Sequence, residues 1–128
     1  MNTNPVDRFL TAITTATITT ADAWAPDAVV DATVPHWRMH LTGSAQIAST
    51  FAGWYADPGA FEELVRVPLP DGELVRFLLT WVERGVPHAA HQTHAIRVHG
   101  GRIVAHTVFC GGRWPAGLLA EMAEASGA

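Results

Sequence analysis

The sequence has a single cysteine, Cys110, no lysine and no long apolar run. A lone cysteine cannot form an internal disulfide, so the sequence predicts a protein of a reducing compartment, the cytoplasm. Residues 1–6 contain neither the basic cluster nor the apolar block of a secretory signal. No apolar stretch approaches the roughly 20 residues of a membrane-spanning helix, so we expect no membrane partner.

Basic charge is also scarce. The chain has 8 basic residues, all of them arginine, against 12 acidic ones, which gives a net charge of −4. The arginines form no basic stripe, so nucleic acid is not an expected partner. Hydrophobic residues make up 48% of the 128 residues and charged residues 16%. We therefore expect one globular domain over residues 1–128, long enough to bury a core without disulfides or metals.

Helical patterns dominate the first half of the sequence. Apolar residues of 6–18 recur at the spacing of an amphipathic helix, and Thr20 is placed to cap a short second helix through residue 24. Apolar residues of 44–56 also follow a helical period. Pro115 suits the first turn of a last helix at the C-terminal end.

Strand patterns dominate the second half. β-Branched residues and alternation predict six extended segments, at residues 28–34, 36–42, 61–67, 73–84, 88–98 and 102–110. Helices that precede an antiparallel meander indicate the α+β class, with one face of the sheet covered. A strongly bent sheet around helices leaves a cone-shaped interior in which pockets form.

Three short motifs resemble a known family. The segment 25–30 (Ala-Pro-Asp-Ala-Val-Val), the pair Gly43 and Ile47, and the segment 100–104 (Gly-Gly-Arg-Ile-Val) resemble nuclear-transport-factor-2-like (NTF2-like) proteins, including their polyketide-cyclase-like branch. The resemblance implies a cone-shaped barrel, in which a strongly bent, mostly antiparallel sheet wraps around N-terminal helices and a short C-terminal helix follows. The family contains isomerases, cyclases, dehydratases, epoxide hydrolases and proteins without catalytic activity.

The carboxylates of two of these enzyme classes have no counterpart in this sequence. The resemblance places the catalytic positions of the epoxide hydrolases at Val75, Phe77 and Val108. The base of the ketosteroid isomerases would fall at Ala32, one residue from Asp31. An epoxide hydrolase and a standard ketosteroid isomerase are therefore disfavoured.

The resemblance also implies which residues face the interior, because residues two apart on a strand share a face. On the last two strands these are the even positions, and on the preceding long strand the odd ones. We expect His94 and His106 to be an acid/base pair, since imidazole titrates near neutral pH. Asp31 would orient a histidine, and Gln92 would donate a hydrogen bond to a developing oxyanion. The residues expected to contact substrate are Gln92, Trp37, Phe77, Trp81, Val108 and Cys110.

The predicted function is therefore a cofactor-independent isomerase, cyclase or dehydratase that acts on a hydrophobic, oxygenated small molecule. The alternative is a non-catalytic protein that binds such a molecule or serves as an accessory subunit, with the buried histidines as hydrogen-bonded core residues. A metal site is disfavoured, because the spacing of His88, His91 and His94 sends neighbouring members to opposite faces of a strand. Cys110 is expected to be inert filler rather than a nucleophile.

One face of the predicted sheet is too apolar for water. We expect this face to pair with a second copy of the chain in a homodimer. Its apolar residues are Leu74, Leu78, Val82, Ile103 and Phe109.

Overall fold

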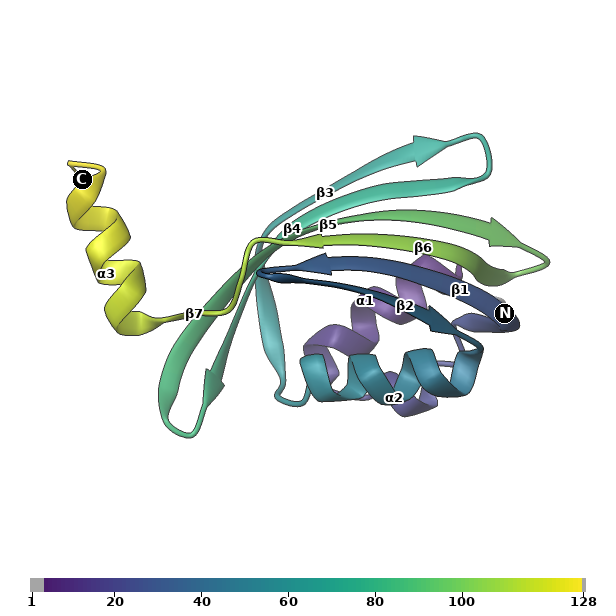
Figure 1. Ribbon diagram of the computed structural model, residues 1–128, viewed down its shortest axis with the longest axis horizontal. Coiled ribbons are helices and arrows are strands. Elements are labelled where there is room, and N and C mark those ends of the chain that lie inside the picture. The colour runs from purple at the N-terminus through teal and green to yellow at the C-terminus, as the bar shows by residue number, and fades with distance from the viewer. Residues whose placement is uncertain (1–3, 128) are drawn as a thin grey trace.

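The computed structural model describes residues 4–127. Helices and strands alternate in the first half of these residues, and strands fill most of the second (Figure 1). The elements in chain order are α1 (Pro5–Thr15), the 3-10 turn η1 (Ile18–Thr20), β1 (Trp24–Val34), β2 (Trp37–Thr42), α2 (Ser44–Trp54), β3 (Gly59–Leu69), β4 (Gly72–Glu83), β5 (Val86–His99), β6 (Arg102–Cys110), β7 (Trp114–Pro115) and α3 (Ala116–Ala125).

The strands form one sheet in the order β2-β1-β6-β5-β4-β3, and the short strand β7 pairs with β5. The pairing of β1 with β6 is parallel, whereas the other pairings are antiparallel. Figure 1 shows the sheet bending over α1 and α2, which both lie on its inner side, while α3 projects away from it. The predicted α+β cone is confirmed. None of the helices within residues 4–127 is long and apolar enough to cross a membrane.

The predicted second helix is wrong. Only η1 is helical there, and Trp24 already belongs to β1. Two residues turn the chain, because Ala16 and Asp22 both have positive φ angles, of 56° and 50°. The carbonyl of Ala23 then accepts a hydrogen bond from the backbone N–H of Ile103 on β6, so strand pairing replaces the helix.

Aromatic side chains of the helices fill the interior against the sheet. Phe9 of α1 lies 5.4 Å from the ring of His94 and 5.0 Å from that of His106, measured between centroids. Phe51 of α2 lies 5.4 Å from His106. The helices therefore seal the two histidines into the core.

Ile103 does not lie on the outer face of the sheet, as predicted, but is fully buried. The register between β5 and β6 shifts between Arg97 and Val98. Such an irregularity reverses which residues of a strand face inward, so Ile103 points into the core although it differs in parity from His106. Val82 and Phe109 are exposed, at 57% and 56%.

Candidate functional site

A cavity of about 330 Å³ lies between the C-terminal end of α2 and the inner face of the sheet. This volume is at the lower end of the roughly 300–1,000 Å³ of small-molecule sites. Most of its wall is apolar or aromatic. The wall residues are Val34, Pro35, Trp54, Tyr55, Leu79, Trp81, Ala90, Gln92, Cys110, Gly112 and Arg113.

Gln92 is the central polar group of the cavity wall. It is buried on β5, with 6% of its surface exposed. Its amide oxygen Oε1 accepts a hydrogen bond of 2.5 Å from the Tyr55 hydroxyl at the end of α2. Its amide nitrogen Nε2 donates to Sγ of Cys110 on β6 over 3.3 Å. Helix and sheet thus meet at this one side chain.

The two predicted histidines lie behind Gln92, in a chain of hydrogen bonds. His94 Nε2 is 2.9 Å from Gln92 Oε1, and His94 Nδ1 is 2.7 Å from His106 Nε2. Trp24 Nε1 donates to His106 Nδ1 over 3.2 Å. Both imidazoles are buried, and neither belongs to the cavity wall.

The donor and acceptor of each hydrogen bond in this series follow from Trp24, its last member. The indole N–H of Trp24 can only donate, so His106 Nδ1 must accept and its proton sits on Nε2. His106 Nε2–H then donates to His94 Nδ1, and His94 Nε2–H donates to the Gln92 oxygen. Each neutral imidazole therefore has one donor and one acceptor nitrogen, and both nitrogens of each ring are engaged.

Burial makes the neutral state of both rings the stable one. It lowers the pKa of His94 to about 3. Burial also lowers the pKa of His106 well below its usual value, with a smaller contribution from His94. Burial raises the pKa of Tyr55 well above its usual value, so its hydroxyl stays protonated. The Tyr55 and Gln92 side chains of the cavity wall are therefore both uncharged at neutral pH.

Arg113 lies at the opening of the cavity with its side chain 48% exposed. It donates to Glu83 over 2.5 Å, and its guanidinium carbon lies 5.1 Å from the centroid of the Trp81 ring. The Trp81 indole N–H donates to the same carboxylate over 3.3 Å. The hydrogen bonds from Trp81 and then Arg113 lower the pKa of Glu83. The opening therefore has an aromatic and ion-paired rim.

Three of the residues predicted to contact substrate line the cavity, namely Gln92, Trp81 and Cys110. Two others lie deeper. Phe77 stacks on His94 with centroids 5.1 Å apart, and Val108 is fully buried. They support the histidine chain rather than the cavity wall.

Asp31 and Trp37 are corrections to the predicted site. Asp31 lies on the opposite face of β1 from the buried Val30, whose strand partner is His106. Its carboxylate pairs with Arg38 over 2.8 Å and lies 3.7 Å from Nε2 of the exposed His40, on the face away from His94 and His106, because strand residues alternate between faces. Trp37 opens the edge strand β2 and is 69% exposed, so it is no part of the cavity wall.

Sequence reasoning missed three residues of the site, Trp24, Tyr55 and Arg113. Trp24 and Tyr55 fit apolar patterns, but a buried indole N–H or phenol O–H needs a hydrogen-bond partner, and this was the available signal. Arg113 follows a pair of glycines in a segment with no period, so its place at the opening had no local signal. No group of three or more His, Cys, Asp or Glu residues within residues 4–127 could hold one metal ion.

The comparisons with known proteins agree with this architecture. No family model and no curated protein matches the sequence. An NTF2-like protein from Anabaena variabilis matches with a TM-score of 0.70 and 12% identity over 84% of each chain. A "putative polyketide cyclase" from Sinorhizobium meliloti matches with a TM-score of 0.59 and 23% identity over 83% of this chain and 94% of the other.

A third similar structure contains a small molecule. It is a Catenulispora acidiphila protein with a ketosteroid isomerase-like fold, in complex with trimethylamine. It matches with a TM-score of 0.61 and 17% identity over 87% of this chain and 88% of the other. At such identities the likeness establishes the fold. The chain has the NTF2-like fold, a fold that is found in proteins named for isomerase and cyclase activity as well as in proteins of unknown function.

Proposed function

We propose that the protein binds a small, mainly apolar organic molecule in the cavity, with Gln92 as its polar contact. The observation that carries this proposal is the cavity itself, about 330 Å³ of mostly apolar space around one buried amide. Apolar walls with a few fixed polar groups are typical of small-molecule sites, where burial supplies affinity and the polar groups supply orientation.

Binding fits the geometry better than acid/base catalysis does. A general base needs a free lone pair within reach of the proton that it removes. The acceptor nitrogen of His94 already receives a hydrogen bond from His106, and the acceptor nitrogen of His106 receives one from Trp24. None of the described residues that line the cavity is Asp or Glu.

The test is to fill the cavity and measure the affinity for a defined probe. Titration with 2-acetylnaphthalene, followed by tryptophan fluorescence, is expected to saturate, since Trp54 and Trp81 lie on the wall. Ala90→Phe places a ring in the cavity and is expected to lower the affinity at least tenfold. Ala95→Phe, on the same strand but outside the wall, should leave it unchanged. No saturation with the unaltered protein, or equal binding by Ala90→Phe, would refute the proposal.

Acid/base catalysis of an isomerisation, cyclisation or dehydration is the second candidate. The observation that favours catalysis is the contact of 2.7 Å between the imidazoles of His94 and His106. Their series of hydrogen bonds ends at Gln92 in the cavity wall. In that role His94 would reach a substrate only after Gln92 moved aside. An enzyme of this kind should speed deuterium exchange at the methyl group of 2-acetylnaphthalene in D₂O, and His106→Ala should abolish that rate with little change in affinity. If the probe binds but its methyl group does not exchange faster, catalysis is refuted and only the binding function remains.

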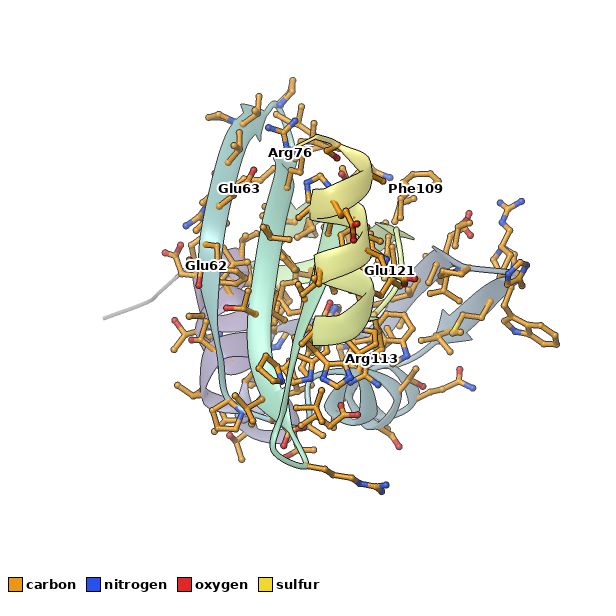
Figure 2. The ribbon with its side chains drawn as sticks, turned by 90° about the vertical axis from the view of Figure 1, so that its left-hand side faces the viewer. Glu62, Glu63, Arg76, Phe109, Arg113 and Glu121 are labelled. Carbon is orange, nitrogen blue, oxygen red and sulfur yellow. The ribbon has the colours of Figure 1, made fainter. Side chains whose placement is uncertain are left out.

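We further propose that a second copy of the chain covers the outer face of the sheet. This face exposes the apolar residues Val82 and Phe109, and no residue of the helix α3 is buried. Figure 2, which looks from this side, shows Arg76 on the sheet and Glu121 on α3. A two-fold axis would bring the acidic helix of one copy to the exposed arginine of the other, so the surface complements itself in charge.

A further inference from the structure

We infer that the chain Trp24–His106–His94 fixes the direction of the Gln92 amide, so that the cavity offers an N–H donor and selects ligands with a carbonyl-type oxygen. The selected ligands are apolar ketones, esters or amides. Gln92 is the group that contacts the ligand, and the other three are positioning residues. The inference rests on the proposed binding function and adds the class of ligand.

The first step is the state of the Gln92 oxygen. It accepts one hydrogen bond from the Tyr55 hydroxyl, at 2.5 Å, and another from His94 Nε2–H, at 2.9 Å. A carbonyl oxygen has two lone pairs, so both are used within the protein. The oxygen therefore has no acceptor capacity left for a ligand.

The second step is the state of the Gln92 nitrogen. An amide nitrogen has two N–H donors, and among the hydrogen bonds of the described residues it makes one, to Cys110 Sγ at 3.3 Å. The other N–H is available on a residue of the cavity wall. An oxygen that accepts two hydrogen bonds also polarises its amide and strengthens the N–H as a donor.

The third step is that the amide cannot simply turn over. A reversed amide would set an N–H against His94 Nε2–H, whereas the Tyr55 hydroxyl could rotate and accept. Moving the imidazole protons to relieve this would place a proton on His106 Nδ1, facing the indole N–H of Trp24. Indole has no acceptor nitrogen, so Trp24 sets the polarity of the whole chain.

The consequence is a preference among ligands of equal shape. A ligand oxygen satisfies the buried N–H, whereas a hydrocarbon leaves it without a partner, and a site of this kind discriminates against the ligand that leaves its polar group unpaired. A matched pair of probes makes this measurable, since 2-acetylnaphthalene and 2-ethylnaphthalene differ mainly in the carbonyl oxygen. Net hydrogen-bond strengths correspond to a preference of about tenfold for the ketone.

The experiment measures the ratio of the two affinities in three proteins. The unaltered protein is expected to prefer the ketone about tenfold. Trp24→Phe removes the fixed donor while keeping an aromatic ring, and it should bring the ratio below about threefold with little change for the hydrocarbon. Trp37→Phe is the control, since Trp37 is exposed on β2. If Trp24 has a purely structural role, Trp24→Phe should lower the affinities for both probes equally, and this result would overturn the inference.

Nitrogen-15 NMR of the unaltered protein supplies a second measurement that does not depend on a variant folding. Both buried imidazoles should show the neutral form protonated at Nε2, and finding the proton on Nδ1 of His106 would overturn the inference. The two proposals fail in different ways. Equal affinity for ketone and hydrocarbon refutes the donor selectivity alone, whereas no binding of either probe refutes the binding function.

Discussion

Individual residues show why a nearly apolar core can hold two imidazoles. His94 and His106 each find a donor and an acceptor inside the protein, and no buried side-chain nitrogen or oxygen among the described residues lacks a partner. Burying an unpaired polar group costs about 1–3 kcal/mol, whereas a paired one is close to neutral. The cost therefore appears only when one ring has to accept a proton.

This cost predicts a fall in stability at mildly acidic pH. The unfolded chain protonates its histidines near pH 6.5, while the folded pKa of His94 is about 3 and that of His106 is well below 6.5. The unfolded state thus binds more protons below pH 6.5, and acid favours it. Each histidine should remove about 2 kcal/mol from the free energy of unfolding between pH 7 and pH 5, measured by urea titration.

The window above pH 5 separates this effect from the carboxylates, which titrate at lower pH. His91 lies on the same strand as His94 but is exposed, so His91→Ala should show the same fall. A free energy of unfolding that stays level between pH 7 and pH 5 would contradict the neutral, buried state of the two rings.

The family resemblance, together with the two-residue period of strands, predicted the interior position of His94, His106 and Gln92, which are all buried. It could not show which of them line the cavity, because α1 and α2 decide how deep each residue lies. The resemblance placed a catalytic base at Ala32 and therefore drew attention to the adjacent Asp31. Adjacent residues of β1 point to opposite faces of the sheet, so Asp31 lies outside the interior. A partner such as Trp24, 82 residues from His106, leaves no trace in local sequence.

At the scale of elements, period and turn residues located the three α-helices and the six long strands of residues 4–127. The end of α1 and the wrongly predicted second helix lie next to positive φ angles at Ala16 and Asp22. Alanine gives no warning of such an angle, whereas aspartate is among the residues that adopt it more often. Strand β7 was missed because a two-residue strand has no period to detect. Local pattern therefore defined the elements, while their ends depended on tertiary pairing.

Two glycines that differ in their surroundings give an element-scale prediction. An added Cβ at Gly53, on α2, would meet nothing within 4 Å, so Gly53→Ala should raise stability by about 0.5 kcal/mol through helix propensity. At Gly72, where β4 begins, the Cβ would lie 1.8 Å from the Ile96 carbonyl oxygen. Gly72→Ala should therefore cost about 3 kcal/mol or more. Thermal unfolding measures both, and a tolerated Gly72→Ala would contradict the β4–β5 packing.

The whole molecule has one inner surface that its helices cover and one outer surface that they leave open. α1 and α2 lie on the inner side, whereas α3 stands apart and none of its residues is buried. A helix of ten residues gains little stability without packing. A partner surface would supply that packing, which connects the position of α3 to the exposed face of the sheet.

The proposed homodimer predicts the effect of a charge on that face. Phe109 is 56% exposed on β6, so Phe109→Glu should leave the monomer as stable as before but bury a charge in any interface that uses this face. Sedimentation velocity at micromolar concentration should show a dimer for the unaltered protein and a monomer for Phe109→Glu. Trp37→Glu, which alters an exposed aromatic residue at the edge strand β2, should remain dimeric. A monomeric unaltered protein would refute the dimer. If Trp37→Glu dissociates the dimer and Phe109→Glu does not, the interface lies at the sheet edge rather than on the outer face.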